Sequence, residues 1–426
     1  MNDKGSAPGQ LHTPGTPGPL AGLRIVDLTT VIMGPYATQI LADYGAEVIK
    51  VEPPEGDVMR TSLPARSPGM GSIYLQVNRN KRSIVLDLKR EAGRDVLLRL
   101  CRTADVVISN IRPAAMRRLR LADADLRAVN PRLINVSLVG YGQDGPYARR
   151  PAYDDLMQGI SGVATLFVAA GGEEPRYVPL TMCDQIVGLN AVHVVLAAVI
   201  ERNRTGQGQS VELPMFETMA QFVLSNHLAG RSFEPPVGKA GYNRLLTADR
   251  RPYRTRDGYV CVLIYLDKHW RGFMDAIGRG DKLKSDPRLA TQTARARHFD
   301  VAYAMVTEVM RERTTGEWLE LFERLDIPCV PLYDVDALID DPHLAQVDFF
   351  QERDHPTEGR MRYTGIPSRW NGTRLEVKRN APNIGEHSVE ILREAGLGEA
   401  EIGALLADGV TVDGTVRAEQ DDRERA

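Results

Sequence analysis

LRIVDLTTVIMGPYATQILADYGAEVIKV, residues 23–51, contains two short apolar strand-like runs separated by a helix-like run. The first strand-like run is 23–28, the helix-like run is 36–44, and Gly45 precedes the second strand-like run at 47–51. Glycine is common just past the end of a helix, and a strand, a helix and a second strand in this order form a βαβ unit. The segment therefore predicts two parallel strands joined by a crossover helix.

The alternation continues beyond this unit. Strand-like runs follow at 83–88, 104–109 and 133–139, with a helix-like run at 91–102. Alternating strands and helices predict an α/β fold with a mostly parallel sheet. Ligands of such sheets bind in the loops at the carboxyl ends of the strands, which here contain residues 29–33, 52–57, 110–112 and 140–145. No GxGxxG follows the first strand, so the sequence does not favour a nicotinamide or flavin dinucleotide.

Composition and charge set limits on the class of protein. The 426 residues are 43% hydrophobic and 26% charged, which is typical of a globular protein and long enough for two domains. The net charge of -3 gives no overall basic field, so nucleic acid is not an expected partner. No apolar stretch is judged long enough and free enough of polar residues to span a membrane.

Cysteine and histidine spacing bears on metals and on the cellular compartment. The four cysteines are scattered without CxxC spacing, and the eight histidines show no metal-ligand motif. We therefore expect neither a disulfide framework nor a metal site, and a reducing, cytoplasmic location.

The predicted domain boundaries lie where the composition and pattern of the sequence change. A Gly- and Pro-rich stretch at 1–18 predicts a disordered leader, and a mostly charged end predicts a tail at 406–426. Residues 19–228 are expected to form the first part of a large α/β domain. An Asp-Gly turn between strand-like runs and later amphipathic helices predict a small α+β domain at 229–340. Residues 341–405 are then a connector that returns to the large domain.

Asp184 is the candidate nucleophile. It ends Pro179-Leu-Thr-Met-Cys-Asp184 and stands directly before an apolar helix-like run at 186–200. Backbone N–H groups and the helix dipole at a helix start favour the ionised form of a carboxyl group, which would then act as a nucleophile without a separate base. An ordinary helix N-cap is the alternative interpretation of the same position, and spacing alone leaves both open.

Several motifs together point to one family. They are Pro19–Asp27, Gly34–Gln39, Gly45–Glu52, Asn80–Lys89, Ala104–Asn110, Gly140–Pro146, Thr205–Gln209 and Ile384–His387. With these motifs in this order and spacing, the chain resembles the class III CoA-transferase family, also called the CaiB/BaiF or formyl-CoA transferase-like family. The resemblance covers roughly residues 19–405.

The resemblance implies an activity and a catalytic residue. Family members carry a catalytic aspartate at a position that corresponds to Asp184, upstream of the Thr205–Gln209 turn. They move CoA from an acyl-CoA to a free carboxylic acid through an aspartyl anhydride and an aspartyl-CoA thioester. CoA is thus part of the substrate, and no tightly bound cofactor is implied.

Contacts with CoA are implied by the same resemblance. They map onto Ile32, Met33, Leu86, Lys89, Asn110, Ile111, Arg112, Arg118, Tyr153 and Asp154, of which the lysine and the two arginines are expected at phosphates. Formyl-CoA transferases carry a glutamine where this chain has Ile32, so a larger acid is expected. The nearest match to the family's Gly-rich lid is Gly238-Lys-Ala-Gly241.

The implied fold is a Rossmann-like large domain built from both chain ends plus a smaller α+β domain, in two subunits that interlock as a homodimer. Arg244, Arg250, Arg251 and Arg254 would suit a dicarboxylate acceptor if they face the site.

Two alternatives remain beside the transferase. An α-methylacyl-CoA racemase needs a histidine where this chain has Tyr153, and tyrosine is a poor base at neutral pH. A non-catalytic CoA-ester binding protein could keep the scaffold, since a fold does not fix a function. Retention of an aspartate at 184 favours the enzyme over this second alternative.

Overall fold

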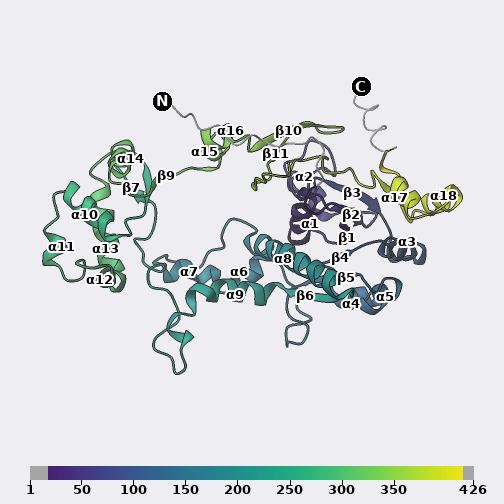
Figure 1. Ribbon diagram of the computed structural model, residues 1–426, viewed down its shortest axis with the longest axis horizontal. Helices are drawn as coiled ribbons and strands as arrows, with labels where there is room; N and C mark the ends of the chain where they lie inside the picture. Colours follow the sequence, from purple (N-terminus) through teal and green to yellow (C-terminus); the bar gives the residue numbers. More distant parts are fainter. Residues whose placement is uncertain (1–17, 416–426) are drawn as a thin grey trace, which may run out of the picture. The chain divides into compact units, whose positions relative to one another are not determined.

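The computed structural model describes residues 18–415 (Figure 1). The expected leader lies almost wholly outside this range and the expected tail lies outside it in part. The described chain divides into two compact units. The first unit runs to Met157 and adds Pro179–Met219 and the segment from His343 onward, whereas the second comprises Gln158–Val178 and Ala220–Pro342. The first unit thus draws on both ends of the chain, and a short internal segment that no sequence signal indicated joins the second.

A six-stranded parallel sheet forms the centre of the first unit. Its strands lie in the order β3 (Lys81–Val85), β2 (Glu47–Glu52), β1 (Arg24–Asp27), β4 (Val106–Ser109), β5 (Ile134–Val139) and β6 (Ser210–Pro214). Every adjacent pair is parallel, with Val26 opposite both Ile49 and Val107. The predicted α/β class with a parallel sheet is confirmed. The strand order reverses between β1 and β4, and such a reversal is the usual place for a ligand in an open α/β sheet.

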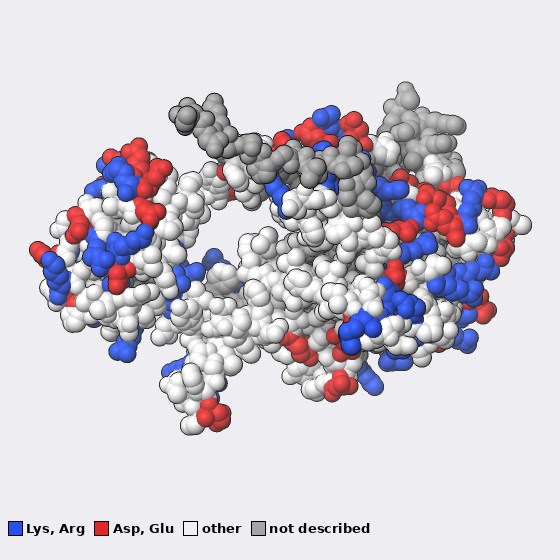
Figure 2. All heavy atoms as spheres, in the orientation of Figure 1, with Lys and Arg blue, Asp and Glu red and all other residues white. Residues whose placement is uncertain are grey.

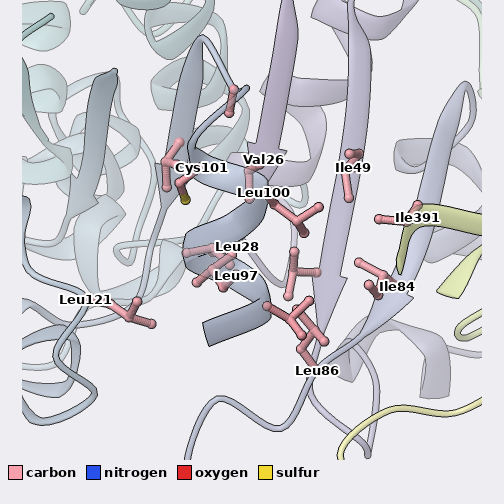
Figure 3. Close-up of a cluster of buried hydrophobic side chains, with 14 of the residues drawn as sticks. Val26, Leu28, Ile49, Ile84, Leu86, Leu97, Leu100, Cys101, Leu121 and Ile391 are labelled. Atoms are coloured by element: carbon pink, nitrogen blue, oxygen red, sulfur yellow. The ribbon is translucent and has the colours of Figure 1, made fainter. Parts of the chain in front are cut away.

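Hydrophobic side chains from distant parts of the chain fill one face of this sheet. Helix α3 (Glu91–Cys101) contributes Leu97 and Leu100, and α17 (Ser388–Glu394) contributes Ile391 (Figure 3). These side chains pack with Val26 and Ile49 of the central strands, and all five are at most 1% exposed. Burial of each large aliphatic side chain is worth about 1.5–3 kcal/mol, so the C-terminal segment is an integral part of the first unit.

The other elements near the sheet complete the first unit. They are α1 (Met33–Asp43), the 3-10 turn η1 (Val58–Thr61), α2 (Ser72–Val77), α4 (Pro113–Arg118), α5 (Asp123–Val129), α6 (Asp154–Ile160), α8 (Met182–Thr205), α9 (Met215–His227), α16 (Pro342–Gln346), the antiparallel hairpin β10 (Phe350–His355) and β11 (Gly359–Thr364), and α18 (Glu399–Ala407). Helices α6, α9 and α16 each extend into the range of the second unit. The hairpin occupies part of the stretch that was expected to be only a connector.

The second unit has its own sheet and core. Strands β7 (Tyr253–Arg254), β8 (Tyr259–Val262) and β9 (Cys329–Pro331) pair antiparallel. Helices of this unit are α7 (Val163–Ala169), η2 (Ala229–Ser232), α10 (Asp267–Ala276), α11 (Lys282–Ser285), α12 (Gln292–Arg297), α13 (Phe299–Met310), α14 (Thr315–Arg324) and α15 (Val335–Ile339). Its core contains Phe273, Trp318 and Phe322, with the last two rings stacked at 5.3 Å. The predicted strand pair on either side of the Asp-Gly turn is present as β7 and β8.

Helix α8 is the longest helix in the described part of the chain. An 18-residue window within its 24 residues has a mean hydropathy of 1.7, so by length and composition alone it could cross a membrane. The expectation that no stretch meets this criterion was therefore wrong. The criterion is weak, because a core helix of a globular protein also meets it, and α8 packs here against α1 and β5. Only 39% of its apolar window is buried within the described chain.

Candidate active site

A cavity of about 770 Å³ opens in the first unit at the point where the strand order reverses. The loop after β1 contributes Thr30 and Val31, the loop after β4 contributes Asn110 and Arg112, and the end of β5 leads to Gly140. Tyr153, Asp184 and Met215 also line the cavity. The other lining residues are Met33, Pro113, Ala114, Arg117, Leu138, Val139, Gln143, Ala148, Arg149, Arg150 and Ala152. The volume is in the range of small-molecule sites, and the cavity lies in the loops that the α/β pattern predicted.

Asp184 reaches this cavity from the first turn of α8. The helix begins at Met182 with Thr181 as its N-cap, so Asp184 lies inside the helix and the N-cap interpretation of its position was wrong. Gly188 follows one turn later on the same helix face, and a Cβ there would come within 2.6 Å of the Met33 carbonyl oxygen. Because glycine at 188 lets α8 approach the start of α1, Asp184 and Met33 line one cavity.

Asp154 contacts the backbone of Asp184. One Asp154 carboxylate oxygen, Oδ2, accepts a hydrogen bond from the Asp184 N–H at 3.0 Å. Burial and, to a smaller extent, the charge of Asp154 together raise the pKa of the Asp184 carboxyl group to about 7. The expectation that the helix start would favour the ionised form was therefore wrong, because burial and a like charge outweigh the helix N-terminus. Near neutral pH the carboxyl group exists in both forms.

The pKa of Asp184 gives a testable pH dependence. A nucleophilic role for Asp184 would require the ionised carboxylate, so we expect the rate of a reaction that uses it to rise with pH through about 7 and to level off above it. Asp154→Asn removes the like charge and keeps an oxygen that can accept from the Asp184 N–H. The midpoint should then move to lower pH, as pH–rate profiles of both proteins will measure. Asp155→Asn, at the exposed neighbour, is the matched control. Identical midpoints for wild type and Asp154→Asn would contradict the assignment.

Three anchors fix the loop after β1. Asn110 bonds Thr30 with both ends of its amide, since Oδ1 accepts from the Thr30 N–H at 3.0 Å and Nδ2 donates to the Thr30 carbonyl at 2.9 Å. Val31 has a φ of 73°, which is rare for a β-branched residue, and its N–H donates to Asp57 Oδ1 at 3.2 Å. The Lys50 ammonium donates to the Thr29 carbonyl at 2.9 Å. These contacts hold the cavity wall in a conformation that the loop sequence alone would not prefer.

Four arginines line the cavity. Of the three basic side chains expected at phosphates, only Arg112 lies there, whereas Lys89 and Arg118 are exposed and outside the lining. The other three lining arginines are Arg117, Arg149 and Arg150. Arg117 neighbours the expected Arg118 on α4, and the phase of a short helix decides which of two adjacent residues faces a cavity. The Arg149–Arg150 pair follows the loop after β5, and this position in the sequence could have been used to predict that the pair lines the cavity.

The other predicted CoA contacts also form two groups, those that lie at the cavity and those that lie outside its lining. Met33, Asn110 and Tyr153 line the cavity, and Asp154 reaches it through its bond to Asp184. Ile32 and Leu86 are buried, the latter completely and within the hydrophobic core, and Ile111 packs against that same core. These three side chains lie outside the lining, so the replacement of glutamine by Ile32 says little about the acyl group.

The residues of the second unit that the sequence suggested for the site lie in a cavity and a loop of that unit. Arg244, Arg250 and Arg251 line a separate cavity within that unit, and Arg254 does not. Gly241 has a φ of 107°, and the loop that contains Gly238 pairs back onto Gly230. Its role as a lid over Asp184 stays a prediction. Within residues 18–415, no group of three or more His, Cys, Asp or Glu side chains could hold a metal ion.

Comparison with known proteins agrees with this geometry. A family model described as CoA-transferase family III matches residues 20–388. A succinate–glutarate CoA-transferase of Agrobacterium fabrum is 32% identical over 396 residues, which cover 88% of this chain and 95% of that protein. A probable fatty acyl-CoA transferase of Mycobacterium tuberculosis is 32% identical over 387 residues, which cover 88% and 97%. The crystal structure of a CAIB/BAIF family protein from Brucella suis has a TM-score of 0.75 at 30% identity, covering 89% of this chain and 100% of that one.

The strand order and the cavity define a doubly wound α/β protein with its ligand site at the reversal of strand order. The chain belongs to CoA-transferase family III, and it is an enzyme of that family.

Proposed function

We propose that this enzyme moves CoA from an acyl-CoA donor to a free carboxylic acid, with Asp184 as the nucleophile. The observation that carries the proposal is the position of the Asp184 carboxyl group, which lines a cavity at the reversal of strand order together with four arginines. A carboxylate suits the reaction because it can act first as nucleophile and later as leaving group.

The steps balance without a net proton or an external reagent. A carboxylate oxygen of Asp184 attacks the thioester carbonyl carbon, the C–S bond breaks, and the electron pair leaves with the CoA thiolate. The thiolate then attacks the aspartyl carbonyl carbon of the mixed anhydride, which releases the donor acid as its carboxylate. An incoming carboxylate repeats both steps in reverse, so the new acyl-CoA keeps the energy of the thioester and Asp184 is regenerated.

The arginines of the cavity are the proposed contacts for the CoA phosphates. Arg112 and Arg117 lie on or next to α4, and Arg149 and Arg150 follow β5. A guanidinium group pairs with phosphate in a bidentate geometry. The apolar side chains Val31, Met33, Leu138 and Met215 of the same cavity provide surface for the less polar part of the ligand.

Succinyl-CoA and a dicarboxylate are proposed among the substrates. A human relative of 29% identity is named succinyl-CoA:glutarate CoA-transferase, and a relative from Haloarcula marismortui of 32% identity is named succinyl-CoA:mesaconate CoA-transferase. Both names describe transfer from succinyl-CoA to a dicarboxylic acid.

A homodimer is also proposed. Helix α8 is apolar, yet Leu189 is 44% exposed and Ile200 is 70% exposed. Figure 2 shows few charged side chains over the part of the surface that carries α8 and α9. A second copy of the chain would cover such a surface. The interlocked arrangement and the cytoplasmic location stay predictions.

The test is mass spectrometry of CoA esters after the protein is mixed with succinyl-CoA and a panel of mono- and dicarboxylic acids. We expect new CoA esters whose identity depends on the acid added, with glutarate or mesaconate charged faster than acetate. Free CoA should not accumulate in step with the reaction, because the thioester is transferred and not hydrolysed. Hydrolysis without any acid-dependent ester would overturn the proposal.

Racemisation at the carbon next to the thioester is the second candidate reaction. It needs a base beside Asp184, and the described lining of the cavity contains Tyr153 and no histidine. Tyrosine has a reference pKa of about 10 and is a poor base at neutral pH. Incubation of a 2-methylacyl-CoA in D₂O with the enzyme tests this reaction directly, because deuterium at the α-carbon would favour the racemase.

A further inference from the structure

The second unit contains a cavity of about 460 Å³ that the proposed transfer does not use. It lies beside the strands β7, β8 and β9 and the helix α13, all within that unit. Its apolar wall consists of Val262, Leu263, Ile264, Val306, Pro328 and Val330. Arg244, Arg250 and Arg251 line the same cavity, so one hollow combines apolar surface with three guanidinium groups.

Two of the arginines are held in place by neighbours. The Nε of Arg244 donates to the Tyr303 hydroxyl at 3.1 Å, and the guanidinium lies over the Tyr265 ring at 5.3 Å from its centroid. Tyr303 itself is only 6% exposed. Such contacts fix the direction of the guanidinium and reduce the entropy lost when it binds an anion. Arg251 pairs with Asp249 at 3.4 Å, and both groups are partly exposed.

Positive charge is in excess at this cavity. The described lining contains three arginines and no Asp or Glu. Asp249, which pairs with Arg251, also accepts from the Thr307 hydroxyl at 2.9 Å. The Arg250 guanidinium has no hydrogen bond or ion pair with any residue in the described part of the chain, and it is exposed. An excess of guanidinium groups around a partly apolar hollow fits an anion that also has hydrocarbon surface to bury.

We propose that this cavity binds an organic carboxylate with an apolar body of several carbon atoms, whose carboxylate meets the arginines and whose hydrocarbon part lies against the strands. The site is distinct from the Asp184 cavity in its residues and belongs to the other unit. It takes a free acid and does not require CoA.

Binding of octanoate to the full-length protein without any CoA ester tests the proposal by calorimetry. We expect octanoate to bind at least about tenfold more tightly than acetate, because its longer hydrocarbon chain buries apolar surface that acetate lacks. The double variant Arg250→Ala/Arg251→Ala should weaken octanoate binding about tenfold or more, since hydrogen bonds to charged groups are lost. Arg254→Ala is the matched control, because this neighbouring arginine is exposed and outside the lining.

Several outcomes would overturn the proposal. These are no octanoate binding, equal binding by wild type and the double variant, or displacement of octanoate by inorganic phosphate at equal concentration. Arg112→Ala, which changes only the other cavity, should keep the octanoate site. CoA transfer is measured separately on the same proteins, so loss of octanoate binding with transfer retained, or the reverse, distinguishes this proposal from the proposed function.

Discussion

Asp184→Asn is expected to lower the rate of CoA transfer on the order of 10³-fold or more, because an amide oxygen cannot replace a carboxylate as nucleophile. The change preserves the size of the side chain and leaves the backbone N–H free to donate to Asp154 Oδ2. The arginines that line the cavity are untouched. We therefore expect the dissociation constant for the CoA ester to stay within about twofold of wild type. Steady-state rates and equilibrium titration with a CoA ester measure the two effects.

The covalent intermediate offers a second measurement of the same role. Wild-type protein mixed with succinyl-CoA and no acceptor acid should carry CoA as a thioester on the peptide that contains Asp184. Asp184→Asn should carry none. Asp155→Asn controls for loss of a carboxylate nearby, since Asp155 is exposed and outside the cavity lining. Undiminished transfer by Asp184→Asn would exclude Asp184 as the nucleophile.

Local sequence patterns were sufficient to predict the strands that consist of buried apolar runs. Strands β1, β2, β4 and β5 lie within a few residues of their expected ranges, because each is a short run of Val and Ile buried on both faces. Strand β6 was missed, since it is a half-exposed edge strand of mixed residues. Its pairing depends on Gly208, where a Cβ would come within 2.2 Å of the Leu133 carbonyl oxygen. No local pattern reports such a long-range approach.

The location of the site could be predicted from the sequence, whereas the side chains that face the cavity could not. The loops after β1 and β4 could be located because their place follows from strand direction. Which side chain faces the cavity depends on helix phase and packing, and so Leu86 lies in the core whereas Arg117 faces the cavity. The pKa of Asp184 depends on burial and on Asp154, thirty positions away in sequence. A helix-start pattern contains neither piece of information.

A buried charge network supports the cavity wall. The Lys50 ammonium is fully buried and lies 2.8 Å from Asp57 Oδ2, and it also donates to the Thr29 carbonyl at 2.9 Å. Asp57 in turn accepts from the N–H of Val31. Burial alone lowers the pKa of Lys50, but Asp57 and Asp27 outweigh burial and leave that pKa raised. The lysine therefore stays charged. Asp57 is its ion-pair partner, whereas Asp27 pairs with Lys81.

Lys50→Met is accordingly expected to destabilise the first unit by about 3–5 kcal/mol, because it leaves the buried Asp57 carboxylate without its partner. Urea unfolding followed by circular dichroism measures this loss. Tryptophan fluorescence is less suitable, because Trp270 and Trp318 lie in the core of the second unit. Lys268→Met is the control. Its pair with Asp326 is exposed at 54% and 87%, and its loss should cost at most about 1 kcal/mol.

The double variant Lys50→Met/Asp57→Leu separates the cost of an unpaired charge from the loss of packing. If the buried carboxylate causes the instability, removal of both charges should restore part of the stability that Lys50→Met loses. Transfer activity should not recover in parallel, because Thr29 and Val31 would still lack their anchors and the wall beside Asp184 would stay free to relax. A Lys50→Met protein as stable as the Lys268→Met control would show that this buried pair does not hold the loop.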